Sequence, residues 1–418
     1  MRASQDTTTA LEDPRLAVRA KPPPPVPIGR AERSLAPDIA RGAMLLFIAV
    51  ANVGLYQWAR PLDEYGHLAD ATAWDQVAHF LEQLLMAERS RPMFAILYGF
   101  GIAVMASRMT ARGIDPKGVR RVLRRRSLWL VALGVLHATL LFMGDILAAY
   151  GITGLIALGL VHLPDRSLRR WLWRTGAFVA LVTTPLLAYV LGEAAMDERV
   201  ASGDHPAGAS YLANMAFGVF ASGASMVFAG LLLSYVPLVI AGLMLQRAGW
   251  LAAPGDHLRA LRRVFCSAMV VNIATALPVS LISLDIWHPE PPVVFVALYV
   301  TLLGGMYAGL GYICGFALLA HRWSARGRRG LPGALAALGE RSLTGYLGQS
   351  ILLAPLLAPW ALGLGEGLGY VGAYAYAVAA WLVTVVVAVM LDRRGVRGPF
   401  ETLLRRLTYS AGPPTRPH

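Results

Sequence analysis

The chain has 418 residues, of which 56% are hydrophobic and only 15% are charged, and its mean hydropathy is +0.52. A soluble domain has about a quarter of its residues charged, so this composition is typical of a membrane-embedded protein. The formal net charge of +13 does not indicate nucleic-acid binding, because the basic residues lie between apolar runs. Cys266 and Cys314 each lie inside an apolar run, which excludes a disulfide framework and a Cys/His metal site.

The composition changes along the chain and divides it into three regions. Residues 1–34 are polar and contain Lys21 followed by the prolines of 22–25, which predicts a disordered cytoplasmic tail. The tail lacks the short apolar region of a cleavable signal peptide, so we expect the first apolar run to stay as an uncleaved signal anchor. Residues 35–395 predict a transmembrane helical bundle, and residues 396–418 predict a cytoplasmic C-terminal segment.

Long apolar runs predict an all-α, polytopic bundle that crosses the membrane about ten times, because a crossing helix needs about 20 apolar residues. Residues 210–222 are also apolar, and either lengthen the sixth span or lie in the membrane interface. The ten spans are expected near 38–58, 92–109, 127–144, 146–163, 175–193, 223–246, 264–284, 293–320, 342–360 and 370–391.

The connections between these spans alternate in charge. Arginine clusters occupy every second connection, near 108–126, 166–174, 259–263, 322–329 and 393–397, whereas the first and fifth spans are followed by acidic loops. The positive-inside rule therefore places the basic loops and both termini in the cytoplasm. The arginines either fix this orientation or also bind the headgroups of membrane lipids, the first expected partners.

Small residues recur at intervals of four in the eighth span, at Thr301, Gly305 and Gly309 and again at Gly311 and Gly315. This spacing lets helix backbones approach closely. We expect the eighth span to lie in the centre of the bundle.

Polar side chains at membrane depth are functional candidates, because burying them in a bilayer is costly. Asn52 lies in the first predicted span, His137 in the third, Asn272 in the seventh and Gln349 in the ninth. Tyr346 and Ser350 accompany Gln349. We expect these side chains to converge on one cavity.

His137 and Asp145 are eight residues apart, which on a continuous helix places them on one face about 12 Å apart. At that separation they bracket a substrate but do not touch. His137 is interpreted either as a general base or as a structural residue bonded to a neighbouring helix. Asp145 either caps the following helix or takes part in the chemistry.

Three further features are interpreted from the residues alone. Asp38 and Arg41 share a helix face and form either a cytoplasmic site for a coenzyme phosphate or an interfacial ion pair. His67 and His79 lie in or near the first outer loop, where a solvated histidine is the commoner outcome. No phosphate-binding loop, zinc motif or nucleophile elbow occurs.

Five ordered motifs carry a family resemblance across residues 33–409. They are Arg33–Gly42 followed by Asn52, Arg91–Gly101, Gly134–Tyr150, Gly339–Ser350 and Gly398–Tyr409. Together they resemble the YeiB-like family of bacterial inner-membrane proteins, which carry the domain of unknown function numbered 418. The resemblance implies localisation in a bacterial inner membrane, with both termini inside.

The opening motif is similar to that of acyltransferase-3 enzymes and of heparan glucosaminide acetyltransferase. In the acyltransferase-3 class, a histidine follows where this chain has Asn52. The glucosaminide enzyme is similar in having asparagine there, which makes His67 the nearest match to its histidine. The chain also departs from its own family at Gly345, where asparagine is usual.

The leading hypothesis is a membrane acyltransferase that takes an acyl group from cytoplasmic acyl-CoA and passes it to a lipid, glycan or small molecule at the outer face. The predicted catalytic residues are His137, Asn52, Asp145 and Gln349, with no metal. The alternatives are a transporter or flippase of a lipophilic molecule and a non-catalytic scaffold, and a homodimer remains open. Asp38 and Arg41 are predicted to bind the donor, and Tyr98, Asn272, Tyr346 and Ser350 the substrate.

Overall fold

The computed structural model describes residues 34–56, 62, 63, 65–195 and 210–409. The predicted N-terminal tail therefore lies, except for its last residue, outside the described residues. Within the described part of the chain, helices dominate and no strand forms beyond an isolated bridge between Leu62 and Leu68. The all-α prediction is confirmed.

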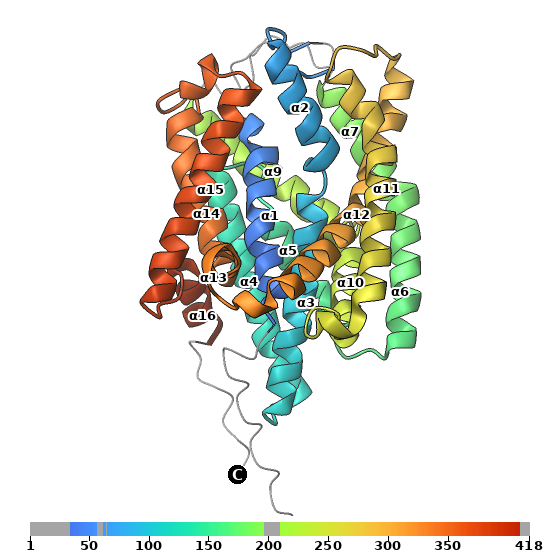
Figure 1. Ribbon diagram of the computed structural model, residues 1–418, viewed down its shortest axis with the longest axis vertical. Coiled ribbons are helices and arrows are strands. Elements are labelled where there is room, and N and C mark those ends of the chain that lie inside the picture. The colour runs from blue at the N-terminus through green and yellow to red at the C-terminus, as the bar shows by residue number, and fades with distance from the viewer. Residues whose placement is uncertain (1–33, 57–61, 64, 196–209, 410–418) are drawn as a thin grey trace, which may run out of the picture.

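Helices from the two halves of the chain pack against one another throughout the bundle (Figure 1). The first half contains α1 (Ala36–Val53), α2 (Ala73–Leu85), α3 (Ser90–Ala111), α4 (Pro116–Leu140), α5 (Leu147–Ala157), α6 (Asp165–Phe178), a π-helical turn (Val179–Thr183) and α7 (Thr184–Ala195). The second half contains α9 (Tyr211–Gly230), α10 (Val236–Arg247), α11 (Leu258–Ile282), α12 (Pro291–Arg322), α13 (Gly330–Glu340), α14 (Ser342–Leu357), α15 (Tyr370–Arg393) and α16 (Pro399–Tyr409).

Seven helical stretches of the described chain are long and apolar enough to cross a membrane. They are Ala36–Tyr56, Ala73–Ala111, Asp165–Glu193, Tyr211–Gly230, Pro254–Ile282, Pro291–Arg322 and Tyr370–Arg393. Three shorter apolar helices, α5, α10 and α14, coincide with predicted spans. The protein is thus a helical membrane bundle.

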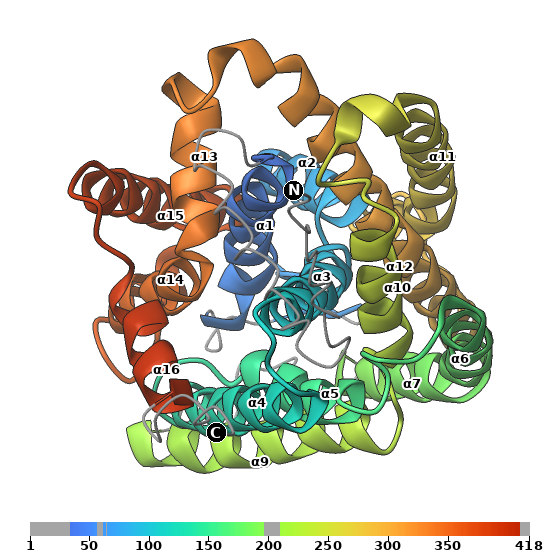
Figure 2. The same ribbon diagram turned by 90° about the horizontal axis from the view of Figure 1, so that it is seen from below.

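The sixth predicted span is wrong as a single helix. Residues 223–230 end α9, residues 236–246 belong to α10, and the chain turns between them with Leu233 at a positive φ of 54°. Pro237 explains the break, because proline lacks the N–H that a continuous helix would need and is accommodated in the first turn of α10. The apolar residues 210–222 accordingly begin a separate helix, which runs along the outside of α4 and α5 (Figure 2).

α1 and α3 lie near the centre of the bundle, and the other helices surround them (Figure 2). The glycines of α12 pack as predicted. A Cβ on Gly305 would lie 2.6 Å from the carbonyl oxygen of Glu88, and one on Gly309 would lie 2.8 Å from the Pro92 side chain. Close approach of α12 to the start of α3 therefore requires glycine at both positions.

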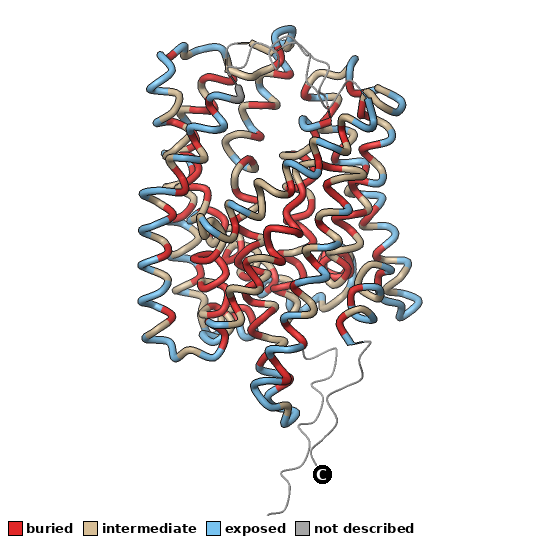
Figure 3. The backbone as a smooth tube through the Cα atoms, turned by 180° about the vertical axis from the view of Figure 1, so that it is seen from behind, coloured by how far each residue is buried: buried red, intermediate tan, exposed pale blue. Residues whose placement is uncertain are grey.

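The two ends of the bundle differ in character. Arginines gather in the loops and flanking helix ends where α3 meets α4, α10 meets α11 and α15 meets α16, and these connections all lie at the lower end in Figure 1. α2 lies at the opposite, upper end. Buried backbone is concentrated in the middle and lower half of the bundle, with exposed segments on the surrounding helices (Figure 3).

The C-terminal helix α16 is joined to the bundle by Glu401. One carboxylate oxygen accepts hydrogen bonds from the backbone N–H groups of Leu343 (2.8 Å) and Thr344 (3.0 Å), and the other accepts one from the Thr344 hydroxyl (2.5 Å). Two of the N–H groups that the start of α14 leaves unpaired are thereby satisfied, and the negative charge faces the positive end of the helix.

Replacing Glu401 by alanine is expected to destabilise the packing of α16 on α14 by about 1–2 kcal/mol, the usual cost of losing a helix cap. Limited proteolysis of the detergent-solubilised protein will then release the C-terminal segment faster, while the rest of the bundle stays resistant. The matched control is Arg405→Ala on the exposed face of the same helix, which should leave the cleavage rate unchanged. Equal rates for the two variants would contradict the capping role.

Candidate functional site

A buried histidine–carboxylate pair joins α4 to α5. His137 lies in the last turn of α4, and its Nδ1 lies 2.8 Å from Oδ1 of Asp145, with the two side chains 2% and 0% exposed. The predicted separation of about 12 Å is wrong, because it assumed a continuous helix. The chain instead turns after Leu140, and this turn brings Asp145 back beside His137.

The surroundings of the pair fix its orientation. Oδ2 of Asp145 accepts the backbone N–H of Ala148 at 2.9 Å, which confirms the predicted capping interaction. The Tyr346 hydroxyl lies 3.5 Å from Oδ1, and its ring is 5.1 Å from the His137 ring. A Cβ on Gly134 would lie 2.5 Å from Oδ2, so glycine is needed where α4 passes the carboxylate.

The second ring nitrogen of His137 makes this pair a candidate for proton transfer. Nε2 is buried and has no hydrogen-bond partner among the described residues. Because Nδ1–H donates a hydrogen bond to the carboxylate, the neutral ring carries its lone pair on Nε2. This is the arrangement in which a carboxylate holds an imidazole in the tautomer of a general base.

Gln349 lies one helical turn beyond Tyr346 on α14. Its Nε2 donates to the backbone carbonyl of Leu45 on α1 at 3.1 Å, and its Oε1 is buried without a partner in the described structure. Ser350 lies next to it and interacts with the Tyr56 hydroxyl at the end of α1. The polar residues of α14 therefore face α1 and the α4–α5 turn together.

A cavity of about 1140 Å³ opens at the upper end of the bundle, away from the arginine-rich connections. Asn52 lines this cavity. Met143, Gly144 and Ile146, which flank Asp145, also line it, so the histidine–carboxylate pair lies directly behind the cavity wall. The prediction that Asn52, His137, Asn272 and Gln349 all line one cavity is wrong, because the other three are buried. His137 is buried beside the α4–α5 turn, Gln349 where α14 packs on α1, and Asn272 against the end of α2.

The helix that enters the membrane after the first loop is interrupted between α2 and α3. Glu88 in this interruption has a positive φ of 59°, an uncommon conformation for a residue other than glycine. Its carboxylate forms an ion pair with Arg91, and both residues line the cavity. The break thus places a charged pair on the cavity wall within the single membrane-spanning stretch Ala73–Ala111.

Arg89 stabilises this break through hydrogen bonds to the end of α2 and to α11. The side chain is fully buried, and its guanidinium donates to the backbone carbonyls of Gln83 and Ala87 at the end of α2. Asn272 of α11 accepts from Nε of Arg89 at 2.6 Å and donates to the carbonyl of Leu84 at 2.9 Å. The carboxamide of Asn272 is therefore engaged with the break, and this residue does not line the cavity.

Asn272→Leu is expected to lower the free energy of unfolding by about 2–4 kcal/mol, because it removes the acceptor of the buried Nε of Arg89 and the donor to the Leu84 carbonyl. Asn52→Leu, at the cavity surface, should change the melting temperature little. Thermal unfolding in detergent distinguishes the two. A melting temperature for Asn272→Leu equal to that of the unmodified chain would remove the structural role assigned to this residue.

Three of the described histidines line the cavity, namely His67, His79 and His288. His79 lies on α2, is 8% exposed, stacks on the Tyr370 ring at 4.1 Å and places Nδ1 3.0 Å from the Tyr374 hydroxyl. The interpretation of His79 as a solvated loop histidine is therefore wrong. His67 lies 3.5 Å from Asp63. Burial raises the pKa of Asp63, but hydrogen bonds from His67 and its charge outweigh this and lower it.

The sequence contained a signal for α2 that the loop interpretation overlooked. Thr72 and Asp75 form a capping box, in which each side chain bonds to the other residue's backbone N–H, and apolar residues follow at helical spacing. Asp75 also accepts the N–H of Val371 at the start of α15 at 2.8 Å. One carboxylate thus fixes the start of two helices at the rim of the cavity.

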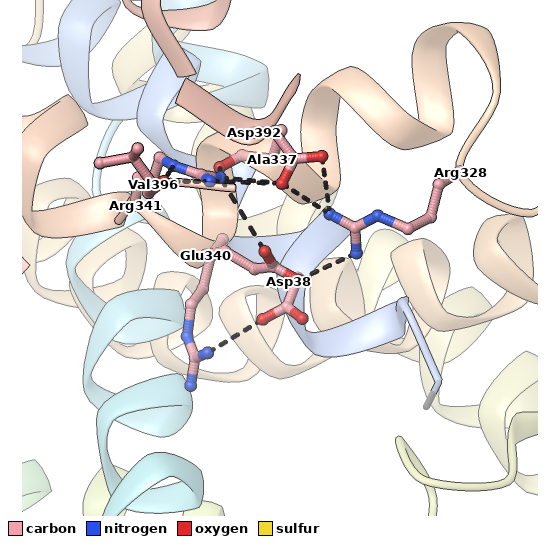
Figure 4. Close-up of polar contacts among 8 residues, drawn as sticks. Asp38, Arg328, Ala337, Glu340, Arg341, Asp392 and Val396 are labelled. Atoms are coloured by element: carbon pink, nitrogen blue, oxygen red, sulfur yellow. Dashed lines mark hydrogen bonds and ion pairs between the residues drawn. The ribbon is translucent and has the colours of Figure 1, made fainter. Parts of the chain in front are cut away.

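At the lower end, ion pairs connect the helix ends (Figure 4). Arg328 binds Glu340 at 2.9 Å and Asp392 at 3.4 Å, and Arg341 binds Asp392 at 3.3 Å. Arg341 also donates to the carbonyls of Ala337 and Val396. These residues were not among the sequence candidates.

Asp38 lies close to this cluster (Figure 4) and pairs with Arg41 at 3.3 Å. Its carboxylate is buried, whereas the Arg41 side chain is 21% exposed. Arg41 also donates to the carbonyl of Leu97 on α3. The predicted ion pair is present within α1, and the hydrogen bond from Arg41 to Leu97 joins α1 to α3.

Tyr98, a predicted substrate-binding residue, lies in the core between α3 and α5. Its ring stacks on Tyr150 at 5.7 Å, and a Cβ on Gly154 would lie 2.2 Å from its hydroxyl oxygen. Tyr98 is not part of the cavity wall.

Comparison with known proteins finds one family model and two bacterial proteins that are similar to most of this chain. Residues 245–411 match the family model described as "Protein of unknown function (DUF418)". The chain is 27% identical over 402 residues to "Uncharacterized protein YeiB" of Escherichia coli (strain K12), covering 92% of this chain and 98% of that protein. This chain is similar to YeiB over most of its length, and its C-terminal part matches the DUF418 model. It is also 23% identical over 411 residues to "Uncharacterized protein YxaH" of Bacillus subtilis (strain 168), covering 90% and 94% of the two chains.

The region matched by the DUF418 model does not contain the whole site. It includes α11 to α16, and with them Asn272, Tyr346, Gln349 and the ion pairs at the lower end. His137, Asp145 and the break between α2 and α3 lie outside it, in the part shared with YeiB. The candidate site of this YeiB-like protein is therefore assembled from both halves of the chain.

Proposed function

We propose that the chain spans a bacterial plasma membrane about ten times, with both termini and the arginine-rich end in the cytoplasm. The long and short apolar helices overlap every predicted span except 127–144, most of which lies on α4, and the basic residues gather at one end of the bundle. Their preference for the cytoplasmic side supports this orientation. The cavity then opens toward the outer face.

On this orientation, the protein is a membrane acyltransferase. The observation that carries the proposal is the buried His137–Asp145 pair, whose Nε2 has no partner in the described structure and which lies behind the wall of a 1140 Å³ cavity. Nε2 accepts the proton of an acceptor hydroxyl or amine as that group attacks the acyl carbonyl. The carbon–sulfur bond of the thioester breaks, and the imidazolium returns the proton to the leaving thiolate.

The neighbouring residues have distinct roles in this scheme. Asp145 holds the imidazole in position and stabilises its charged form, while Tyr346 supports Asp145. Asn52, on the cavity wall, donates a hydrogen bond to the carbonyl oxygen as it becomes negatively charged, while Gln349 and Ser350 hold α14 against α1 and the turn that follows it. Because His137 is closed off from the cavity, the turn that carries Phe142 and Gly144 has to move before the acceptor reaches Nε2.

The acyl donor binds at the cytoplasmic end. Acyl-CoA carries phosphates and a thioester, and Arg41, partly exposed beside Asp38 at the lower end of α1, supplies a cation for a phosphate. About 14 residues of helix separate Asp38 from Asn52, which corresponds to about 21 Å along α1. A pantetheine arm reaching along α1 would carry the thioester from the phosphate site toward the cavity.

Calorimetric titration of the purified protein with acyl-CoA tests the donor site. We expect saturable binding that Arg41→Gln weakens at least tenfold, because a charged contact to a phosphate is lost. Arg174→Gln, on the exposed surface of α6, is the matched control and should bind normally. If no acyl-CoA binds while a lipophilic substrate crosses liposomes that contain the protein, the acyltransferase proposal is wrong.

Passage of a lipophilic substrate without acyl-CoA binding would favour a transporter. One structural observation supports this alternative. Interrupted helices that line a cavity at membrane depth are typical of transporter substrate sites, and the break between α2 and α3 has this form. Rocking of α2 against α3 would then move the Glu88–Arg91 pair.

A further inference from the structure

We propose that the acceptor held in the cavity is a membrane lipid, with its headgroup against α2 and the start of α3 and its hydrocarbon chain against α7, α11 and α12. This inference rests on the proposed function, since it names the acceptor of the transfer. It excludes the soluble sugars and small molecules that the reaction alone would allow.

The first observation is the apolar wall. The side of the cavity formed by α7, α11 and α12 is lined by Leu191, Val279, Ile282, Val294, Leu298 and Leu302. α7 and α12 meet closely there, since a Cβ on Gly192 would lie 3.9 Å from the Leu298 side chain. A water-filled cavity would leave this surface hydrated at a cost of about 25 cal/mol for each Å². A hydrocarbon chain removes that cost.

The second observation is the polar wall on the other side. It is lined by His67, His79, Glu82, Gln83, Glu88 and Arg91, from the first loop, α2 and the start of α3. Glu82 is 6% exposed and, among the described residues, its only ion-pair neighbour is His79 at 3.7 Å. Carboxylates, imidazoles and a guanidinium together offer both donors and acceptors to a hydrated headgroup.

The two walls face one another across a single space of about 1140 Å³. Pockets for drug-sized molecules have volumes of about 300–1000 Å³, so this cavity accommodates a larger ligand. A soluble polar ligand would satisfy the α2 side and leave the α12 side bare, and a purely apolar ligand would desolvate Glu82 and Arg91 without compensation. An amphiphile satisfies both walls at once.

Photolabelling tests this inference without requiring catalysis. The probe is lysophosphatidylglycerol with a diazirine in its acyl chain, added to the full-length protein in phosphatidylcholine nanodiscs. We expect adducts at Val279, Leu298 and neighbouring cavity residues, which excess unlabelled lysophosphatidylglycerol suppresses and glycerophosphoglycerol does not. Leu298→Trp, which fills the apolar side, should reduce these adducts at least tenfold.

Two variants act as controls. Leu382→Trp places the same bulk on α15 at a side chain that is 50% exposed and outside the cavity, and should leave the adducts unchanged. Val294→Trp serves as a second cavity-filling variant if thermal unfolding shows that Leu298→Trp is misfolded. Adducts confined to residues outside the cavity would overturn the inference. Cavity adducts that persist in both Leu298→Trp and Val294→Trp would also overturn it. His137→Asn should retain the adducts, so that a failure of the transfer chemistry is distinguishable from a failure of lipid binding.

Discussion

His137→Asn is expected to reduce acyl transfer by about 10²–10⁴-fold, the usual contribution of a general base. The asparagine side-chain nitrogen occupies nearly the place of Nδ1 and still donates to Asp145, so the carboxylate keeps a partner. What disappears is Nε2, the atom that accepts the proton. The measurement is the initial rate of label transfer from radiolabelled acyl-CoA in membranes that contain equal amounts of each variant.

His137→Ala separates this effect from stability. It removes both ring nitrogens and leaves the buried carboxylate of Asp145 without its partner, so it should also lower the melting temperature. His137→Asn should lose activity while melting near the temperature of the unmodified protein. If His137→Asn transfers acyl groups at the normal rate, His137 is not the base, and His79 becomes the next candidate within the cavity.

Gly339→Val is expected to prevent stable folding. A Cβ at this position would lie 1.8 Å from the carbonyl oxygen of Asp38, which belongs to the backbone of α1 and cannot rotate away. Gly42 lies in the same crossing, with a Cβ 2.1 Å from the carbonyl oxygen of Leu335 on α13. Overpacking commonly costs about 1–3 kcal/mol, and a clash with backbone on this scale is expected to exceed that range.

The matched control for this prediction is Gly223→Val in α9, where a Cβ would meet no atom within 4 Å. Size-exclusion chromatography in detergent and thermal unfolding should show that Gly339→Val aggregates or melts at a lower temperature. Gly223→Val should elute and melt like the unmodified protein. Equal melting temperatures would mean that α1 and α13 do not cross as closely as described.

The helical membrane fold could be predicted from hydropathy and the charge of the connections. Both signals are local, since apolar length and arginine position depend on the bilayer rather than on tertiary contacts. The sixth span was predicted as one helix because its apolar residues are nearly continuous. Pro237 is the signal for the break within it, and this signal was outweighed by the apolar run. α2 was missed because its acidic residues resembled a loop, although Thr72 and Asp75 formed a recognisable capping box.

The candidate site was predicted in its residue types but not in its geometry. His137 and Asp145 were both identified, but their contact depends on the turn after Leu140, which periodicity does not reveal. Arg89 was not identified as a buried residue, because an arginine close to Arg91 and Glu88 is typical of a charged cluster at the membrane interface. Its burial depends on Asn272, which is 183 residues away in the chain. Asn272 was identified as functional, and the structure assigns it to the support of a broken helix instead.

The most direct measurement of the central claim uses purified protein reconstituted in liposomes of bacterial phospholipid. Radiolabelled acyl-CoA is added to the side that carries the arginine-rich loops, and the lipids are then extracted and separated. The account predicts a labelled lipid whose amount increases with time and falls to background with His137→Asn. If the thioester stays intact at every chain length tested, or if the label reaches lipid equally well with His137→Asn, the account is contradicted.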